Sequence, residues 1–154
     1  MNHRTRGPMT LQLDRFLPYR LSVLANTVSA AIANVYAERH DLSIPEWRVI
    51  AVLAQEPGLS AAEVAARTAM DKVAVSRAVA RLLKSRRLRR GATSADRRRL
   101  SLELTAAGRD VYNRIVPWAR DYERRLLEAL DAEAARALDD ALRRLTDRAH
   151  ELAL

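Results

Sequence analysis

Apolar residues along most of the chain recur at steps of three and four, which is the spacing of one face of an α-helix. The first such stripe predicts a long helix from about Leu11 to Arg39, and it consists of Leu17, Leu21, Leu24, Val28, Ile32 and Val35. A heptad-like stripe predicts a last helix after Asp131, and it consists of Leu138, Leu142, Leu145, Ala149 and Leu152. The chain is therefore predicted to begin and end in long amphipathic helices.

Three shorter helices between these two are marked by capping signals. Ser43 with Glu46, and Ser60 with Glu63, have the spacing of capping boxes, and Asp71 suits the start of a helix that runs to about Ser85. A Pro-Gly pair at residues 57–58 ends the first of the three. The second and third helices are joined by a short turn, which predicts a helix-turn-helix.

The pattern then changes to a period of two. Leu88 to Ala92 and Leu100 to Leu104 read as two short strands, and residues 93–98 form the tip of the hairpin between them. In the second strand the leucines face one side, and the alternate residues, Ser101 and Glu103, face the other. The predicted order α-α-α-α-β-β-α-α is that of a mostly α protein with a small β-wing, a winged helix-turn-helix between terminal helices.

A further long helix follows the hairpin. Thr105 is placed to cap it, and Pro117 predicts a kink or a restart within it. The terminal helices have two interpretations at this point: they pack on each other within one chain, or they pack against a second copy.

Composition narrows the class of protein. The 154 residues are 49% hydrophobic and only 5% aromatic, which favours a mostly helical globular protein. No apolar run approaches the roughly 20 residues that cross a bilayer, and the basic first residues lack the apolar stretch of a secretory signal, so we expect no membrane association and a cytoplasmic location. The chain has no cysteine, which excludes disulfides, thiolate catalysis and cysteine zinc sites.

Positive charge is concentrated in one segment. Residues 71–99 contain eleven basic and two acidic residues, a net charge of +9, while the whole chain carries +8. The rest of the sequence therefore sums to about −1. Soluble helix faces usually mix both signs, so this segment indicates a surface that binds a polyanion.

The helix after Asp71 has the side chains of a recognition helix. Lys72, Ala74, Ser76 and Arg77 combine short side chains with donors, which suits a helix lying deep in the major groove. Arg81 on the same helix is predicted to contact the phosphate backbone. The alternative is that these cations are only solvated.

The hairpin tip is the second predicted contact. Arg97, Arg98 and Arg99 cannot all point the same way, so we expect one to enter the minor groove and its neighbours to bind phosphate or the partner helix. Asp96 is predicted to orient one of these guanidinium groups, and an Asx-turn at the tip is an equally good interpretation.

The sequence resembles the MarR family of transcription regulators over nearly its whole length. The stretch DRRRLSLELT from Asp96 to Thr105 resembles that family's wing, joined by EWRVI at 46–50, SAAEVAA at 60–66 and VAVSR at 73–77. The resemblance implies that Arg98 is the wing-tip arginine and that Asp96 helps to hold the wing. The family usually has a glycine directly after the recognition helix, and in this chain Arg87 is interpreted as standing there.

The resemblance also implies an assembly. Residues 10–40 and 106–154 would form a helical dimerisation region of an obligate homodimer, and residues 43–105 the winged helix-turn-helix. A twofold dimer places two recognition helices about 34 Å apart and so predicts a palindromic operator in double-stranded DNA.

In this family small aromatic carboxylates or phenols bind where the dimer helices meet the DNA-binding part. An anionic ligand needs a cation and flat apolar walls, and the candidates for these are Arg20, Tyr36, His40, Trp47 and Tyr112. The alternative is that Tyr36 and Trp47 belong to the core and that His40 only ends the first helix.

The sequence thus predicts a sequence-specific DNA-binding regulator, most simply a repressor released by a small ligand. The alternative is a non-specific architectural DNA- or RNA-binding protein. An enzyme is not expected, because the three histidines are widely scattered and no Gly-rich phosphate loop is present. We expect no cofactor and no metal.

Overall fold

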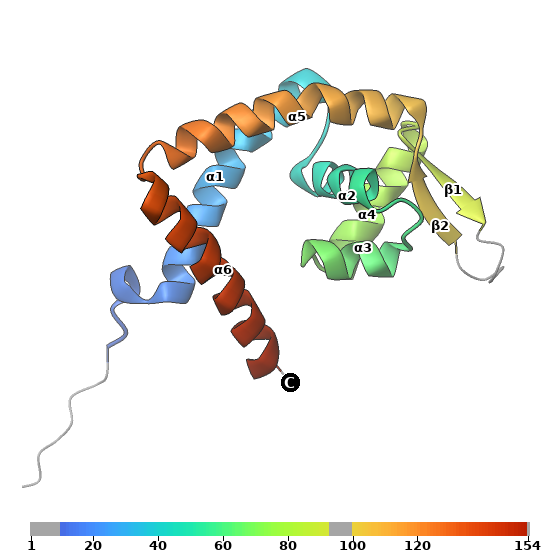
Figure 1. The fold of residues 1–154 in the computed structure, drawn as a ribbon. Helices are drawn as coiled ribbons and strands as arrows, with labels where there is room; N and C mark the ends of the chain where they lie inside the picture. Colours follow the sequence, from blue (N-terminus) through green and yellow to red (C-terminus); the bar gives the residue numbers. More distant parts are fainter. Residues whose placement is uncertain (1–9, 93–99, 154) are drawn as a thin grey trace, which may run out of the picture. The chain divides into compact units, whose positions relative to one another are not determined.

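The computed structural model describes residues 10–92 and 100–153, whose elements follow the predicted order (Figure 1). They are a 3-10 turn (Leu13–Arg15), α1 (Leu17–His40), α2 (Ile44–Gln55), α3 (Ala61–Thr68), α4 (Lys72–Lys84), β1 (Leu88–Ala92), β2 (Leu100–Leu104), α5 (Ala106–Leu127) and α6 (Ala132–Leu152). This confirms the predicted class, a mostly helical fold with a small two-stranded wing.

The predicted helix starts are confirmed by their hydrogen bonds. The Glu46 carboxylate accepts from the Ser43 backbone N–H at 2.9 Å, and Glu63 accepts from the Ser60 N–H at 2.8 Å, so both capping boxes are closed. Asp131 caps α6 by accepting from the Ala134 N–H at 2.8 Å. These helices begin where a side chain satisfies backbone donors that no helical carbonyl reaches.

The first helix starts later than predicted. The stripe suggested a start near Leu11, but α1 begins at Leu17 after an extended Phe16 and the separate 3-10 turn. Pro18 suits this start, because proline has no N–H for a helical bond and is favoured in the first turn. The extended backbone of Phe16 separates the 3-10 turn from α1.

Pro117 does not restart the fifth helix. It lies inside α5, which runs without a break from Ala106 to Leu127. Pro117 and Asn113, the residue four positions before it, are both exposed. Water can therefore satisfy the Asn113 carbonyl that the missing N–H leaves without its helical partner.

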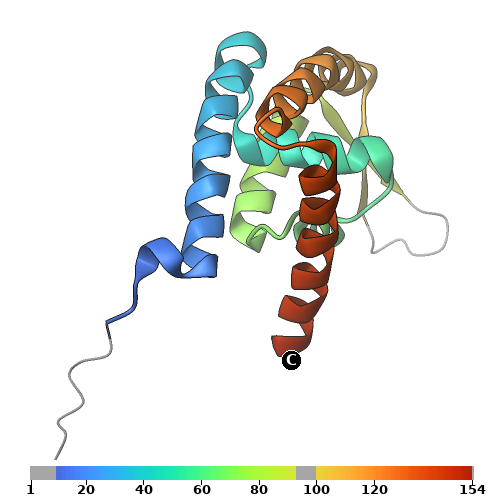
Figure 2. The same ribbon diagram turned by 60° about the vertical axis from the view of Figure 1, so that its left-hand side comes forward.

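The described residues group into two compact units, one ending at Arg109 and the other beginning at Asp110. In the first unit the wing lies at the end remote from α1 (Figure 1, Figure 2). Its core joins α2, α3, α4 and the sheet, and its buried apolar side chains include Val49, Ile50, Leu53, Val64, Val75, Val79, Leu82, Leu88 and Leu102.

The wing is an antiparallel pair with Leu88 opposite Leu104. Leu102 also exchanges backbone hydrogen bonds with the α2–α3 turn, accepting from the Gly58 N–H at 3.0 Å and donating to the Leu59 carbonyl at 2.9 Å. Ser101, which alternates with the leucines of β2, is buried like Leu102. Gly91 lies opposite Ser101, and a Cβ on Gly91 would lie only 2.8 Å from the Ser101 Oγ. A glycine at position 91 therefore leaves room for the Ser101 side chain.

The left-handed residue after α4 is Arg86, with φ of 57°, and not Arg87. The Arg86 N–H bonds the Leu83 carbonyl and the Arg87 N–H bonds the Leu82 carbonyl at 2.9 Å, which is the Schellman arrangement. The position that suits glycine is thus one residue earlier than predicted. Holding an arginine there costs roughly 1 kcal/mol more than holding a glycine.

None of the helices in residues 10–92 and 100–153 is long and apolar enough to cross a membrane. Nor do the histidine, aspartate and glutamate side chains of these residues gather anywhere in a group of three or more suited to a metal ion.

Candidate nucleic-acid interface

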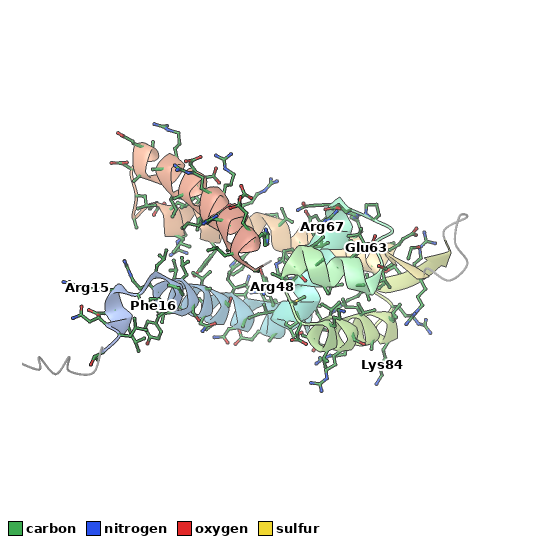
Figure 3. The ribbon with its side chains drawn as sticks, turned by 90° about the horizontal axis from the view of Figure 1, so that it is seen from below. Arg15, Phe16, Arg48, Glu63, Arg67 and Lys84 are labelled. Atoms are coloured by element: carbon green, nitrogen blue, oxygen red, sulfur yellow. The ribbon has the colours of Figure 1, made fainter. Side chains whose placement is uncertain are left out.

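The outer face of α4 is polar and cationic, and its inner face is apolar. Val75, Ala78, Val79 and Leu82 are buried against α2, α3 and β1. The exposed face includes Lys72, Ser76, Arg77, Arg81 and Lys84, and Lys84 lies at the edge of the protein (Figure 3). Of the residues predicted to contact DNA on this helix, only Ala74 is half-buried. The structure therefore gathers the predicted cations on one surface.

The start of α4 is held by Asp71. One oxygen of its carboxylate accepts from the backbone N–H groups of both Val73 and Ala74 at 2.9 Å. The turn before it contains Ala69 in the left-handed region, with φ of 51°. Because Asp71 already bonds two of the first amides of α4, side chains are the main groups that this face offers to a ligand.

The helix before the turn is tied to the end of α2 by an ion pair. The Arg67 guanidinium donates to both oxygens of Glu56, at 2.8 Å from Nη2 to Oε2. The hydrogen bond and the charge of Arg67 lower the pKa of Glu56 below its usual value. Both side chains are exposed, so this pair orients α3 more than it stabilises the fold.

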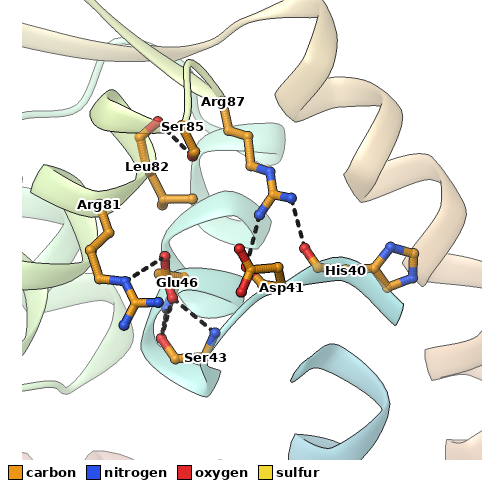
Figure 4. A network of polar contacts seen from close by, with 8 residues as sticks. All are labelled: His40, Asp41, Ser43, Glu46, Arg81, Leu82, Ser85 and Arg87. Atoms are coloured by element: carbon orange, nitrogen blue, oxygen red, sulfur yellow. Dashed lines mark hydrogen bonds and ion pairs between the residues drawn. The ribbon is translucent and has the colours of Figure 1, made fainter. Parts of the chain in front are cut away.

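Arg81 approaches the buried carboxylate of Glu46 from the far end of α4 (Figure 4). Its Nε lies 3.5 Å from Glu46 Oε1, while the Glu46 residue is only 3% exposed. The other Glu46 oxygen accepts from the Ser43 hydroxyl at 2.6 Å. Glu46 therefore has two roles, since it caps α2 and fixes the direction in which Arg81 leaves the helix.

Arg87 joins three elements at one residue. Its guanidinium donates to the backbone carbonyls of His40 at 2.7 Å and of Asp41 at 3.0 Å, at the end of α1 (Figure 4). Its own carbonyl accepts from the Thr105 N–H at 3.1 Å, at the start of α5. A surface pocket of about 390 Å³ beside it is lined by Asp41, Glu46, Arg81, Lys84, Ser85 and Arg87.

Two arginines precede the wing tip. Arg89 in β1 pairs with Glu103 in β2 at 2.6 Å, and Arg90 is exposed. The predicted tip residues Asp96, Arg97, Arg98 and Arg99 lie outside the described residues, so their assignment stays a prediction.

Two of the predicted ligand-binding residues are brought together. The rings of Tyr36 and Trp47 lie 5.3 Å apart at an angle of 42°. Tyr36 is 2% exposed, and burial raises the pKa of its phenol to about 12 although a hydrogen bond with Trp47 lowers it in part. The pair thus packs between α1 and α2, with Tyr36 buried and Trp47 half-buried.

The remaining three predicted residues are His40, Arg20 and Tyr112. His40 contributes its carbonyl to Arg87, as described above. Arg20 is exposed on α1, sixteen residues and so roughly 24 Å before Tyr36 along the helix, too far for one small pocket within the same chain. Tyr112 belongs to the second unit.

Two residues of this surface were missed by sequence reasoning. Val73 is exposed on the outer face of α4, and its spacing from Ser76 and Arg77 would have placed it there. The Arg87 contacts to α1 had no sequence signal, because the bonded residues lie 46 and 47 positions away.

Comparisons with known proteins agree with this architecture. A model of the MarR family matches residues 40–99, from the end of α1 to the wing. The HTH-type transcriptional repressor Rv2887 of Mycobacterium tuberculosis is 31% identical over 131 residues, which are 84% of this chain and 91% of that protein.

Solved structures cover the chain more fully. A MarR/EmrR family transcriptional regulator from Acinetobacter sp. ADP1 matches with a TM-score of 0.85 at 26% identity, over 92% of this chain and 99% of the other. The PcaV transcriptional regulator from Streptomyces coelicolor, solved in complex with its natural ligand, matches with a TM-score of 0.72 at 25% identity, over 91% and 98%. As the sequence resemblance predicted, the chain belongs to the MarR family of transcriptional regulators, and so to a class of regulators rather than of enzymes.

Proposed function

We propose that this regulator is a homodimeric repressor that binds a specific palindromic site in double-stranded DNA and is released by a small ligand. The observation that carries the proposal is the outer face of α4. Lys72, Ser76, Arg77 and Arg81 are exposed together on a helix whose opposite face is fully packed. A cationic helix presented in this way suits the major groove.

The dimer is supported by apolar side chains that are exposed in one chain. Leu138, Leu142 and Leu145 form a stripe on α6 and are 41–44% exposed. Leu17, Leu21 and Leu24 form a second stripe on α1. Such patches mark protein interfaces, and a twofold dimer would present two α4 helices to two half-sites about 34 Å apart.

The wing is the second part of the proposed interface. Arg97, Arg98 and Arg99 would follow β1 and precede β2, beside α4, with Arg98 entering the minor groove and Asp96 holding it. Arg81 and Lys84 at the far end of α4 would bind the phosphate backbone.

Release by a ligand is supported by the PcaV relative, whose structure contains its natural ligand. We propose an aromatic or phenolic carboxylate for this chain, with Tyr36, His40, Trp47 and Tyr112 as the residues to test. Arg20, too far from Tyr36 in the same chain, would supply its cation only from the second copy of the dimer. The ligand would favour a dimer arrangement that no longer matches the half-site spacing. We place this activity in the cytoplasm, because the proposed partner is DNA.

The proposal is tested by isolating genomic fragments that the purified protein retains. We expect one site to bind with nanomolar affinity against excess random duplex at physiological salt. A panel of benzoate and phenol derivatives should contain a compound that dissociates this complex. Equal affinity for all duplexes, or for RNA, would instead show the non-specific architectural protein that is the alternative.

A further inference from the structure

Val73 is a large apolar side chain on the otherwise polar outer face of α4. It is 58% exposed. The other large apolar side chains that are exposed within residues 10–92 and 100–153 all lie before residue 25 or after residue 125. Val73 is therefore separate from the stripes that we assign to the dimer.

The neighbours of Val73 are the residues of the proposed DNA interface. It follows Lys72, and helical spacing places it one turn before Ser76 and Arg77, all of which are exposed. The core valines Val75 and Val79 lie on the opposite face.

Folding offers no reason for a valine here. A β-branched residue is a poorer helix former than lysine, glutamate or alanine, because the helix restricts its χ1 angle. An exposed position does not return that loss through burial. The apolar surface at this position is therefore suited to contact with something outside the chain.

Val73 is also held in a fixed direction. The Asp71 carboxylate accepts from its backbone N–H at 2.9 Å, which anchors the first turn of α4. A valine in a helix has one strongly preferred rotamer. The two methyl groups are thus presented rigidly, without the loss of freedom that a longer side chain suffers on binding.

The chemistry of the major groove leaves one matching feature. Base edges there present hydrogen-bond donors and acceptors, except for the C5 methyl group of thymine. We propose that Val73 is a specificity-determining residue that packs against the C5 methyl of a thymine in each half-site. This inference rests on the proposed DNA-binding function, and it adds a base identity to it.

The test is a double-mutant cycle between protein and DNA. Val73→Ala removes methyl groups from the protein, and replacing a thymine by uracil removes one methyl group from the DNA. An operator is first selected from a random duplex library with the unaltered protein, and each thymine is then replaced by uracil, which lacks the methyl. We expect one thymine in each half-site whose replacement weakens binding about fourfold. Val73→Ala changes both protomers of the dimer, so it should weaken binding about sixteenfold, and it should abolish the sensitivity to uracil at that position only.

The outcomes separate this inference from the function beneath it. Uracil replacement in the flanking sequence is the DNA control. The protein control is the melting temperature of Val73→Ala, which should not fall, because alanine is the better helix former. A selected operator without a methyl-sensitive thymine, or uracil effects that are the same in Val73→Ala, would overturn the role of Val73 alone. A library in which no sequence is enriched would overturn the proposed repressor function together with it.

Discussion

The helices α4 and α6 both carry a regular apolar stripe, yet only the stripe of α4 is covered within the chain. Val75, Val79 and Leu82 of α4 are at most 5% exposed, whereas no described residue of α6 is buried and its Leu142 is 44% exposed. Periodicity alone cannot distinguish the two cases. The apolar stripe of α4 is buried by α2, α3 and the sheet, which all lie within about sixty residues of sequence. The apolar stripe of α6 is suited to contact with a second chain.

Leu142→Asp should have the largest effect. It should prevent dimer formation, and through it operator binding, without unfolding the protomer. A charge placed in the proposed dimer interface costs at least about 3 kcal/mol, more than a hundredfold in the dimer dissociation constant. Light scattering should show monomers, and operator binding should be lost. Arg136→Asp, on the opposite side of α6, is the matched control, and a Leu142→Asp protein that remained dimeric would remove α6 from the interface.

Gly108→Ala should act on the fold and not on assembly. A Cβ on Gly108 would lie 2.1 Å from the Arg87 carbonyl oxygen, which cannot move without breaking its bond to the Thr105 N–H. We expect a loss of about 3 kcal/mol in the free energy of unfolding. Gly58→Ala is the comparison, because its φ is 90° but its Cβ would meet nothing, so about 1 kcal/mol should be lost. Equal losses by denaturant titration would contradict the close contact.

Arg98→Ala should weaken operator binding by about 1–3 kcal/mol and leave the dimer and the melting temperature unchanged. The measurement is fluorescence anisotropy with the operator duplex. Arg120→Ala removes the same charge from an exposed position on α5 and controls for the net charge of the protein. If the two variants bound equally well, the assignment of the wing arginine would be wrong.

Arg87→Met should lower the free energy of unfolding by about 1–2 kcal/mol, because the carbonyls of His40 and Asp41 lose a charged donor. Arg89→Met is matched in charge and removes only an exposed pair with Glu103, so it should cost less than about 0.5 kcal/mol. Thermal unfolding of both variants would show whether Arg87 stabilises the contact between the end of α1 and the start of β1. Equal melting temperatures of the two variants would argue against such a contact.

Ala69→Gly should have the smallest effect and the opposite sign. The left-handed backbone at Ala69 favours glycine, so we expect a gain of about 0.5–1 kcal/mol after the added freedom of the unfolded chain. Ala66→Gly, within α3, should instead destabilise by about 1 kcal/mol. A loss of stability in both variants would show that the turn tolerates alanine without strain.

Sequence reasoning succeeded where the signal is local. The two capping boxes, the Asp71 cap and both strand ranges depend on residues two to five positions apart, so their spacing is visible in the sequence. It failed where a local rule competes with the surroundings. Pro117 predicted a kink or a restart, and the restart is absent because α5 continues through it; the glycine-like position was placed at Arg87 instead of Arg86.

The sequence by itself determined the order of elements, the capped starts of α2, α3, α4 and α6, and the concentration of charge between residues 71 and 99, since each depends on neighbouring residues. Only the tertiary structure decided which stripe is covered, that Ser101 is buried, that Val73 is exposed among cations, and that Arg87 reaches α1. These features arise from contacts between residues that are far apart in the sequence. Such contacts leave no periodic or spacing signal, because any residue of suitable size and charge can make them once the helices have packed.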